Sequence, residues 1–178
     1  MKKVSSVLLL LVCLACATGT SKLIEEEKLS FSYTDEAYLF FRNMRQAQYD
    51  RTEMEKEGLR LYQHDDYSEE QLFKTKITVN WRANRAYVLI DLADSTEKID
   101  VKVSYKRAKG EWIEIVPENL RRQGELAFLT DIYNHIQEEH TLFLTFRGQE
   151  PEPLFTTADD QEAFRVSMYD FYRMTGVL

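Results

Sequence analysis

The segment ITVNWRANRAYVLIDL, residues 77–92, decides the fold that this sequence predicts. Its first part alternates apolar and polar side chains, and its last part, from Ala86 to Leu92, is a mainly apolar run. Alternation with a period of two is typical of a strand with one buried face, and the four residues RANR between the parts have the character of a turn. We therefore predict a β-hairpin here.

A second hairpin is predicted directly after the first. Apolar and polar residues alternate from Ile99 to Tyr105, a turn is expected at Ala108-Lys109-Gly110, and residues 112–116 return. Pro117 ends the last strand, because proline has no N–H to donate to a neighbouring strand. The two hairpins together predict an antiparallel meander at about residues 77–116.

After Pro117 the apolar period changes from two to 3.6 residues, which predicts helices at about 123–138 and 159–175. The second helix is preceded by Thr156 and Thr157, each with an aspartate three residues on, and a capping box needs this spacing. Between the helices, residues 141–147 predict a strand, which a right-handed crossover would place parallel to residues 112–116. The expected fold class is α+β, with a mainly antiparallel sheet that is mixed if the crossover pair forms.

The region before the meander leaves two readings open. A short strand is expected at residues 29–33, and Thr34-Asp35-Glu36 resembles the start of a helix. For residues 36–56 we favour a helix that ends near Gly58, while a long strand from Tyr38 to Arg45 is the alternative. A short strand at residues 59–62 and a polar loop that begins at His64 are expected to follow.

The N-terminus begins with Met1-Lys2-Lys3, continues with an apolar run at residues 4–12, and then reads Cys13-Leu14-Ala15-Cys16. The apolar run is too short to span a bilayer as a stable helix. These features resemble the precursor of a bacterial lipoprotein, although Cys13 stands where an aliphatic residue is usual. The resemblance implies that a signal peptide of residues 1–15 is removed and that Cys16 receives acyl chains. An ordinary secretory signal cleaved near Ala15 or Ala17 and an uncleaved short anchor are the alternatives.

Cysteine usage agrees with a lipid anchor, because both cysteines lie in this segment and none occurs from Ala17 to Leu178. An intrachain disulfide in the domain is thereby excluded, and two or more acyl chains would hold the protein stably on a membrane. We expect Cys16 and a tether at residues 16–30, followed by a single α+β domain at residues 31–178. The resemblance also implies a place in the cell envelope. In some lipoproteins an aspartate after the lipidated cysteine retains the protein in the inner membrane, and because residue 17 is alanine, the outer membrane is favoured.

The balance of charge disfavours some partners. The chain has a net charge of −7, and removal of Lys2 and Lys3 with a signal peptide would make it more negative. Such a protein is poorly suited to nucleic acid or to an anionic lipid surface. The expected partners are the membrane, through the lipid anchor, and an envelope protein or glycan, with no nucleic acid.

Histidine and carboxylate side chains gather at one place, His135 to His140, where Glu138 and Glu139 lie between the two histidines. On a helix, His140 is five residues beyond His135 and begins the next strand, so too few ligands are expected to converge on a metal ion. We therefore expect no metal and no cofactor. His64 is expected in a polar loop without a partner.

Pairs of aspartates are the remaining candidates for acid–base chemistry or calcium binding. They fall where turns, strand ends and helix starts normally collect aspartate, so we assign no catalytic residue. The pairs are Asp65/Asp66, Asp91/Asp94 and Asp159/Asp160.

Trp81 and Trp112, near the two hairpin turns, are the candidate binding surface, while most other aromatic residues are expected to pack in the core. The function that we favour is a membrane-anchored, non-catalytic binding or interaction module. A hydrolase of envelope glycans or peptides is one alternative and would need two carboxylates or a histidine in a shared cleft. A module that binds a small ligand or lipid is the other, and it would need an apolar cavity.

Overall fold

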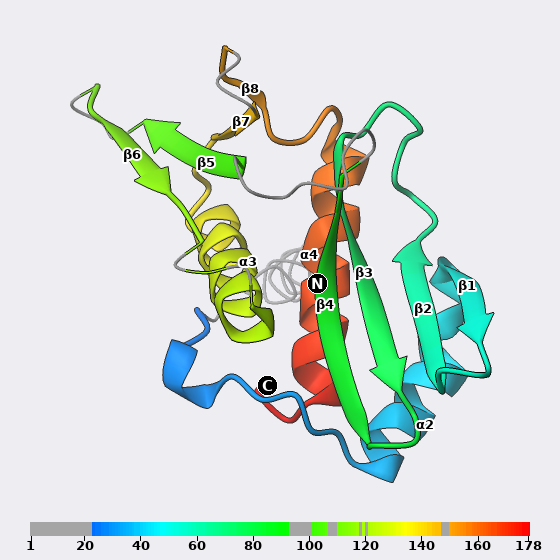
Figure 1. Ribbon diagram of the computed structural model, residues 1–178. Coiled ribbons are helices and arrows are strands. Elements are labelled where there is room, and N and C mark those ends of the chain that lie inside the picture. The colour runs from blue at the N-terminus through cyan, green and yellow to red at the C-terminus, as the bar shows by residue number, and fades with distance from the viewer. Residues whose placement is uncertain (1–22, 93–100, 107–109, 118, 120, 147–149) are drawn as a thin grey trace, which may run out of the picture.

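The computed structural model describes residues 23–92, 101–106, 110–117, 119, 121–146 and 150–178 (Figure 1). The predicted signal peptide and Cys16 lie outside these residues. The described part contains three α-helices and two antiparallel four-stranded sheets, which confirms the predicted α+β class. In Figure 1, α2 and α4 lie behind the first sheet, and α3 lies beside α4 below the second sheet.

The first sheet, sheet A, is a meander of four consecutive strands. Its strands are β1 (Tyr49–Met54), β2 (Leu59–His64), β3 (Phe73–Asn80) and β4 (Arg85–Leu92). The predicted hairpin of residues 77–92 is β3–β4, with Ile77 opposite Val88. Asn84 adopts a left-handed conformation in its turn (φ 50°), which asparagine tolerates better than most residues.

The second sheet, sheet B, has the order β6-β5-β7-β8. Its strands are β5 (Val101–Lys106), β6 (Trp112–Ile115), β7 (Leu142–Phe146) and β8 (Glu152–Pro153). The second predicted hairpin is confirmed as β5–β6. The predicted crossover does connect two strands that run in the same direction, β6 and β7, but β5 lies between them and pairs antiparallel with both. The expected antiparallel arrangement is therefore confirmed, and the possible parallel pair of β6 and β7 does not form.

The expectation that both hairpins join in one meander at residues 77–116 is wrong, because the outer edge of β4 already has partners. Near one end of the strand, Ala86 donates its backbone N–H to the carbonyl of Phe31 at 2.8 Å, and Ser32 forms a bridge with Arg85. Farther along, Ile90 donates its N–H to the Glu125 carboxylate. The strand expected at residues 29–33 is reduced to this bridge.

The ambiguous segment at residues 36–56 is a helix in its first half and a strand in its second, so the alternative of a strand from Tyr38 to Arg45 is wrong. Helix α2 (Asp35–Met44) begins at Thr34, whose side chain accepts a hydrogen bond from Ala37, and a 3-10 turn (Gln46–Gln48) leads into β1. The helix is shorter than expected, since the chain turns after Arg45 and pairs with β2 along the whole of β1. Long-range pairing here overrides the helical period.

The two remaining predicted helices are confirmed. Helix α3 is Arg122–Gln137, and α4 is Ala158–Met174 with a capping box formed by Thr157 and Asp160. Phe164, Met168, Phe171 and Tyr172 of α4 are fully buried and make the centre of the core. In the described part of the chain, no helix is both long and apolar enough to cross a membrane.

The described part of the expected tether packs on the domain. Ile24 is buried, and its backbone N–H and carbonyl bond to the Asn134 side-chain amide of α3 at 2.8 and 2.9 Å. The Asn134 side chain thus holds both the backbone N–H and the backbone carbonyl of Ile24. The folded part of the chain therefore reaches back at least to Ile24.

Candidate functional site

The two predicted tryptophans lie on different sheets and are not brought together. Trp81 directly follows β3, which ends at the lower end of sheet A in Figure 1, whereas Trp112 is the first residue of β6, a strand at the upper left. Trp81 is 40% exposed and Trp112 is 48% exposed. Two separate surfaces therefore have to be considered.

Trp81 is part of an open hollow of about 310 Å³ between the β1–β2 and β3–β4 turns, which we call the Trp81 surface. The Arg82 guanidinium carbon lies 5.0 Å from the centre of the Trp81 ring, and that of Arg60 lies 5.9 Å from it. Cations at such distances are attracted to the electron-rich face of an indole ring. The residues of the Trp81 surface are Glu53, Glu55, Leu59, Arg60, Trp81 and Arg82.

The arginine beside Trp81 is fixed by the backbone of the neighbouring turn. Arg82 donates hydrogen bonds to the carbonyls of Glu55 and Lys56 at 2.9 and 3.0 Å. It passes so close to Gly58 that a Cβ built there would lie 2.6 Å from the Arg82 Cδ atom. Gly58 therefore leaves the space in which Arg82 crosses from one turn to the other.

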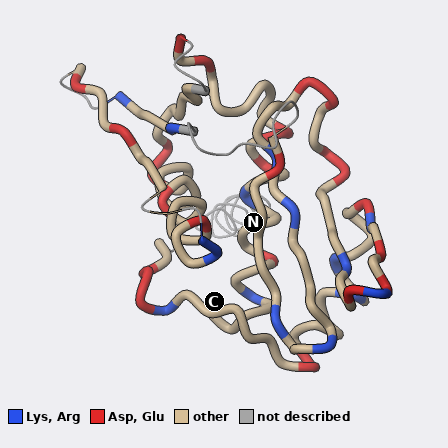
Figure 2. Tube along the Cα trace, viewed as in Figure 1, with Lys and Arg blue, Asp and Glu red and all other residues tan. Residues whose placement is uncertain are grey.

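Arg60 is held in a similar way by a carboxylate and a phenol. Its Nε atom donates to Glu53 at 2.9 Å, and one terminal nitrogen donates to the Tyr38 hydroxyl at 3.0 Å. Figure 2 shows basic and acidic residues interspersed along the β1–β2 hairpin that carries these groups. The Trp81 surface thus presents an aromatic ring among fixed charges of both signs.

Trp112 has a simpler environment. Its ring packs edge-on against Phe143 at 5.2 Å, and the Lys106 ammonium lies 5.9 Å from the ring centre. Both contacts come from strands of sheet B, and Lys106 is itself exposed. Trp112 therefore covers the outer part of sheet B, with no fixed polar frame like that of Trp81 among its described contacts.

The histidine and carboxylate groups at the end of α3 do converge, contrary to the sequence-based expectation. We call His135, Glu138 and His140 the His–Glu cluster. The Nδ1 atom of His135 lies 3.1 Å from His140 Nδ1 and 3.1 Å from Glu138 Oε2, and His140 Nδ1 lies 3.4 Å from the same oxygen. Burial lowers the pKa of His135, while the Glu138 carboxylate opposes this shift, so the depressed pKa favours the neutral imidazole.

The turn that brings His140 back to His135 could not be read from helical spacing. Glu139 has a positive φ of 62°, its N–H bonds to the carbonyl of Ile136, and the N–H of His140 bonds to the carbonyl of His135. This left-handed turn folds the chain back over the last turn of α3. The available signal was weak, because asparagine or glycine is usual at such a position and here it is glutamate.

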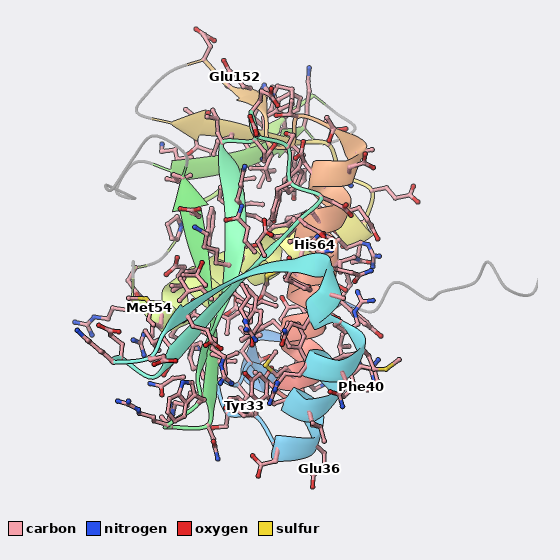
Figure 3. All side chains as sticks on the ribbon, turned by 90° about the vertical axis from the view of Figure 1, so that its right-hand side faces the viewer. Tyr33, Glu36, Phe40, Met54, His64 and Glu152 are labelled. Carbon is pink, nitrogen blue, oxygen red and sulfur yellow. The ribbon has the colours of Figure 1, made fainter. Side chains whose placement is uncertain are left out.

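His64 is the third histidine and lies at the end of β2 rather than in a loop, beside α4 in Figure 3. It is almost fully buried, and its ring contacts the Tyr49 ring edge-on at 5.0 Å. Its Nδ1 atom accepts the backbone N–H of Asp66 at 3.3 Å, which occupies the lone pair that a metal ion would need. Burial lowers the pKa of His64, with Asp66 and Asp65 opposing the shift.

The described aspartates of the candidate pairs have structural partners or lie exposed. Asp160 is fully buried and caps α4, and Asp91 forms an ion pair with Lys76 at 2.6 Å. Asp65, Asp66 and Asp159 are exposed, and Asp94 lies outside the described residues. These positions do not bring the described members of different pairs into one cleft.

The chain was compared with protein-family models, curated proteins and solved structures, and none of them matches it. The Trp81 surface and the His–Glu cluster are thus characterised by their own geometry.

Proposed function

We propose that this protein is a non-catalytic binding module of the cell envelope, anchored by lipid at Cys16, and that it binds an envelope protein through the Trp81 surface. The observation that carries the proposal is the exposed Trp81 ring, which stands beside two arginines whose positions are fixed by hydrogen bonds. Tryptophan and arginine are the residues most often responsible for binding energy at protein interfaces.

Preorganisation favours this surface over the one around Trp112. Immobilising a side chain on binding costs about 0.5–1.5 kcal/mol in conformational entropy. Arg82 and Arg60 are already held by hydrogen bonds in the folded protein, so they lose less entropy when a partner binds. Gly58 and two backbone carbonyls hold Arg82. The described contacts of Trp112 include no comparable arrangement.

A protein partner fits the Trp81 surface better than a glycan does. A sugar ring stacks on an open aromatic face, but the Arg82 guanidinium lies over the Trp81 ring. The hollow also contains Glu53 and Glu55 next to the arginines, so charges of both signs are available to pair with a protein surface.

The sequence pattern at residues 1–16 supports the anchor, and the fold limits the reach of such an anchor. Because Ile24 is held on α3, only the segment from Ala17 to Leu23 separates Cys16 from the domain. The eight Cα–Cα steps from Cys16 to Ile24 span at most about 29 Å when fully extended. The domain would thus work close to the membrane surface.

The anchor is tested by metabolic labelling with a fatty acid and by mass spectrometry of the mature N-terminus. We expect Cys16→Ala to abolish the label, while Cys13→Ala, the matched control, retains it. An unmodified N-terminus at another residue, or a label that survives in Cys16→Ala, would refute the anchor.

The binding surface is tested by crosslinking in cells that produce the protein. A photoreactive amino acid replaces Met54, which is 39% exposed and lies at the tip of the β1–β2 hairpin next to Glu53 (Figure 3). We expect one discrete protein adduct that disappears when Trp81→Ala is added and persists with Trp112→Ala. Lack of an adduct, or one that persists with Trp81→Ala, would contradict the proposal, and binding of purified cell-wall glycan that requires Trp81 would assign the surface to a glycan instead.

A further inference from the structure

The three donor atoms of the His–Glu cluster form a compact triangle of possible metal ligands. Its sides are 3.1, 3.1 and 3.4 Å, between two imidazole nitrogens and one carboxylate oxygen. A neutral imidazole nitrogen either carries a proton or offers a lone pair, but does not do both. Each pair of atoms in the triangle needs one proton between them.

With the carboxylate ionised, no arrangement of protons satisfies all three sides. If His135 Nδ1 carries the proton, the lone pair of His140 Nδ1 faces the negative oxygen of Glu138. If His140 Nδ1 carries it, the lone pair of His135 faces that oxygen, and if both carry protons the two N–H groups face each other at 3.1 Å. A cation bound by all three atoms removes the conflict, because each atom can then offer it a lone pair.

The triangle has the dimensions of one face of a zinc tetrahedron. A zinc ion about 2.0–2.1 Å from each nitrogen and oxygen donor holds those donors about 3.4 Å from one another. The measured sides are within a few tenths of an ångström of that value. Two imidazoles and one carboxylate are also a ligand set that suits zinc among the common divalent ions.

The surrounding residues hold the two imidazoles in position. The ring centre of Tyr105, on β5, lies 4.2 Å from that of His135 and 4.5 Å from that of His140, so one buried phenol ring contacts both. The backbone of Glu139 fixes the turn between the ligands. Both ring orientations are thereby set by groups that do not belong to the triangle, as outer-shell residues do at metal sites.

We propose that His135, Glu138 and His140 bind a divalent transition-metal ion, zinc in the first place, through His135 Nδ1, Glu138 Oε2 and His140 Nδ1. Three protein ligands leave a fourth tetrahedral position for water. The side chains are 21%, 43% and 33% exposed, so the ion can enter from solvent. His140 also lines a surface pocket of about 290 Å³ with Phe155 and Gln161, in which an outside molecule would lie next to the cluster.

This site is independent of the proposed function. The His–Glu cluster lies between the end of α3 and sheet B, whereas the Trp81 surface belongs to sheet A. Binding of a metal ion therefore neither requires nor excludes a protein partner at Trp81. The failure of one proposal would leave the other unaffected.

The test is a titration of the purified, metal-free mature protein with Co²⁺, followed by competition with Zn²⁺. Cobalt reports its geometry through its visible absorption, and we expect one tetrahedral ion per chain that zinc displaces. Glu138→Gln and His135→Gln should weaken binding by at least the roughly 10–100-fold that outer-shell changes cost. Glu36→Gln is the matched control, because it removes the same charge at an exposed position on α2 and should leave affinity unchanged.

Glu138→Gln also keeps the test independent of folding, since that side chain is 43% exposed and its loss should not unfold the domain. Selective loss of the tetrahedral cobalt spectrum in Glu138→Gln and His135→Gln would support the site. Absence of the spectrum in the wild type, or equal affinity of wild type and Glu138→Gln, would overturn it.

Discussion

The Glu125 Oε1 atom lies 2.7 Å from the backbone nitrogen of Ile90, so a carboxylate on α3 accepts a hydrogen bond from β4. Both residues are buried. A side chain thus takes a position on the strand edge where another strand would pair. This contact connects the choice of sheet partners to the packing of α3 against sheet A.

The contact predicts a graded loss of stability at position 125. Glu125→Ala leaves the buried N–H of Ile90 without this acceptor, and we expect a loss of about 1–3 kcal/mol in the free energy of unfolding. Glu125→Gln keeps an oxygen in place and should lose less. Urea unfolding measures both, with Glu111→Ala at an exposed position as the control, and equal midpoints for Glu125→Ala and Glu111→Ala would contradict the role of this contact.

The same contact explains why the sequence predicted the hairpins but not the division into two sheets. Each hairpin is decided by alternation and by a turn within about 16 residues, as in residues 77–92, and both are confirmed. The outer edge of β4 is instead occupied by Phe31 and Glu125, which are distant along the chain. Periodicity does not encode such long-range choices.

In the candidate sites too, features set by neighbouring residues were predictable from the sequence, and contacts between distant residues were not. Exposure of Trp81 near a turn was predictable, but Arg60 and Gly58 come from other strands and turns, and only the sheet register places them beside it. For His140, helical spacing gave the wrong answer, because a glutamate in the left-handed conformation turns the chain back. The expectation that no metal is bound relied on that spacing.

Substitutions at two glycines with the same φ can distinguish the loss of Arg82 packing from the cost of backbone strain. Gly58 and Gly176 both have φ of 71°, but a Cβ at Gly58 would collide with Arg82, while a Cβ at Gly176 would have no atom within 4 Å. Alanine in this conformation costs about 1–2 kcal/mol at either position. We expect Gly58→Ala alone to displace Arg82 and to change the fluorescence of Trp81, measured in a Trp112→Phe background. The same spectrum for both glycine variants would show that Arg82 does not depend on Gly58.

Two carboxylates on α4 should differ strongly in their effect on stability. The Asp170 side chain is 2% exposed. Arg45 Nε donates to both of its carboxylate oxygens at 3.0 Å, and the Tyr49 hydroxyl donates to one of them at 2.8 Å. The charge left behind, on Arg45, is 29% exposed, so the loss is that of hydrogen bonds to a charged group, and we expect Asp170→Ala to lose about 1.5–3 kcal/mol in urea unfolding.

Glu162 pairs with Arg165 at the surface of the same helix, with side chains 53% and 37% exposed. Exposed pairs contribute at most about 1 kcal/mol, so Glu162→Ala is the matched control. Similar losses in the two variants would mean that the Arg45–Asp170 pair does not hold α2 and β1 against α4.

Asp160 should make the protein sensitive to acid. Burial alone raises its pKa, but hydrogen bonds from Thr157 and Ser68 to its two oxygens outweigh burial, so the pKa in the folded state lies below its ordinary value. The folded state therefore favours the carboxylate, and its stabilising contribution is complete above the unfolded pKa of about 3.9. The contribution is lost as the pH falls through the depressed folded pKa.

Replacement by asparagine removes this pH dependence. We expect Asp160→Asn to lower the free energy of unfolding at pH 7 by about 1–3 kcal/mol, because the amide nitrogen cannot accept the bonds that the carboxylate accepts. The difference from wild type should shrink as the pH falls from 4 to 2, since wild-type Asp160 then becomes protonated and loses its own advantage. Asp159→Asn, at the exposed neighbouring position, should follow the wild type throughout. Urea unfolding at each pH measures the difference, and a gap between wild type and Asp160→Asn that stays constant down to pH 2 would show that the Asp160 charge does not stabilise the fold.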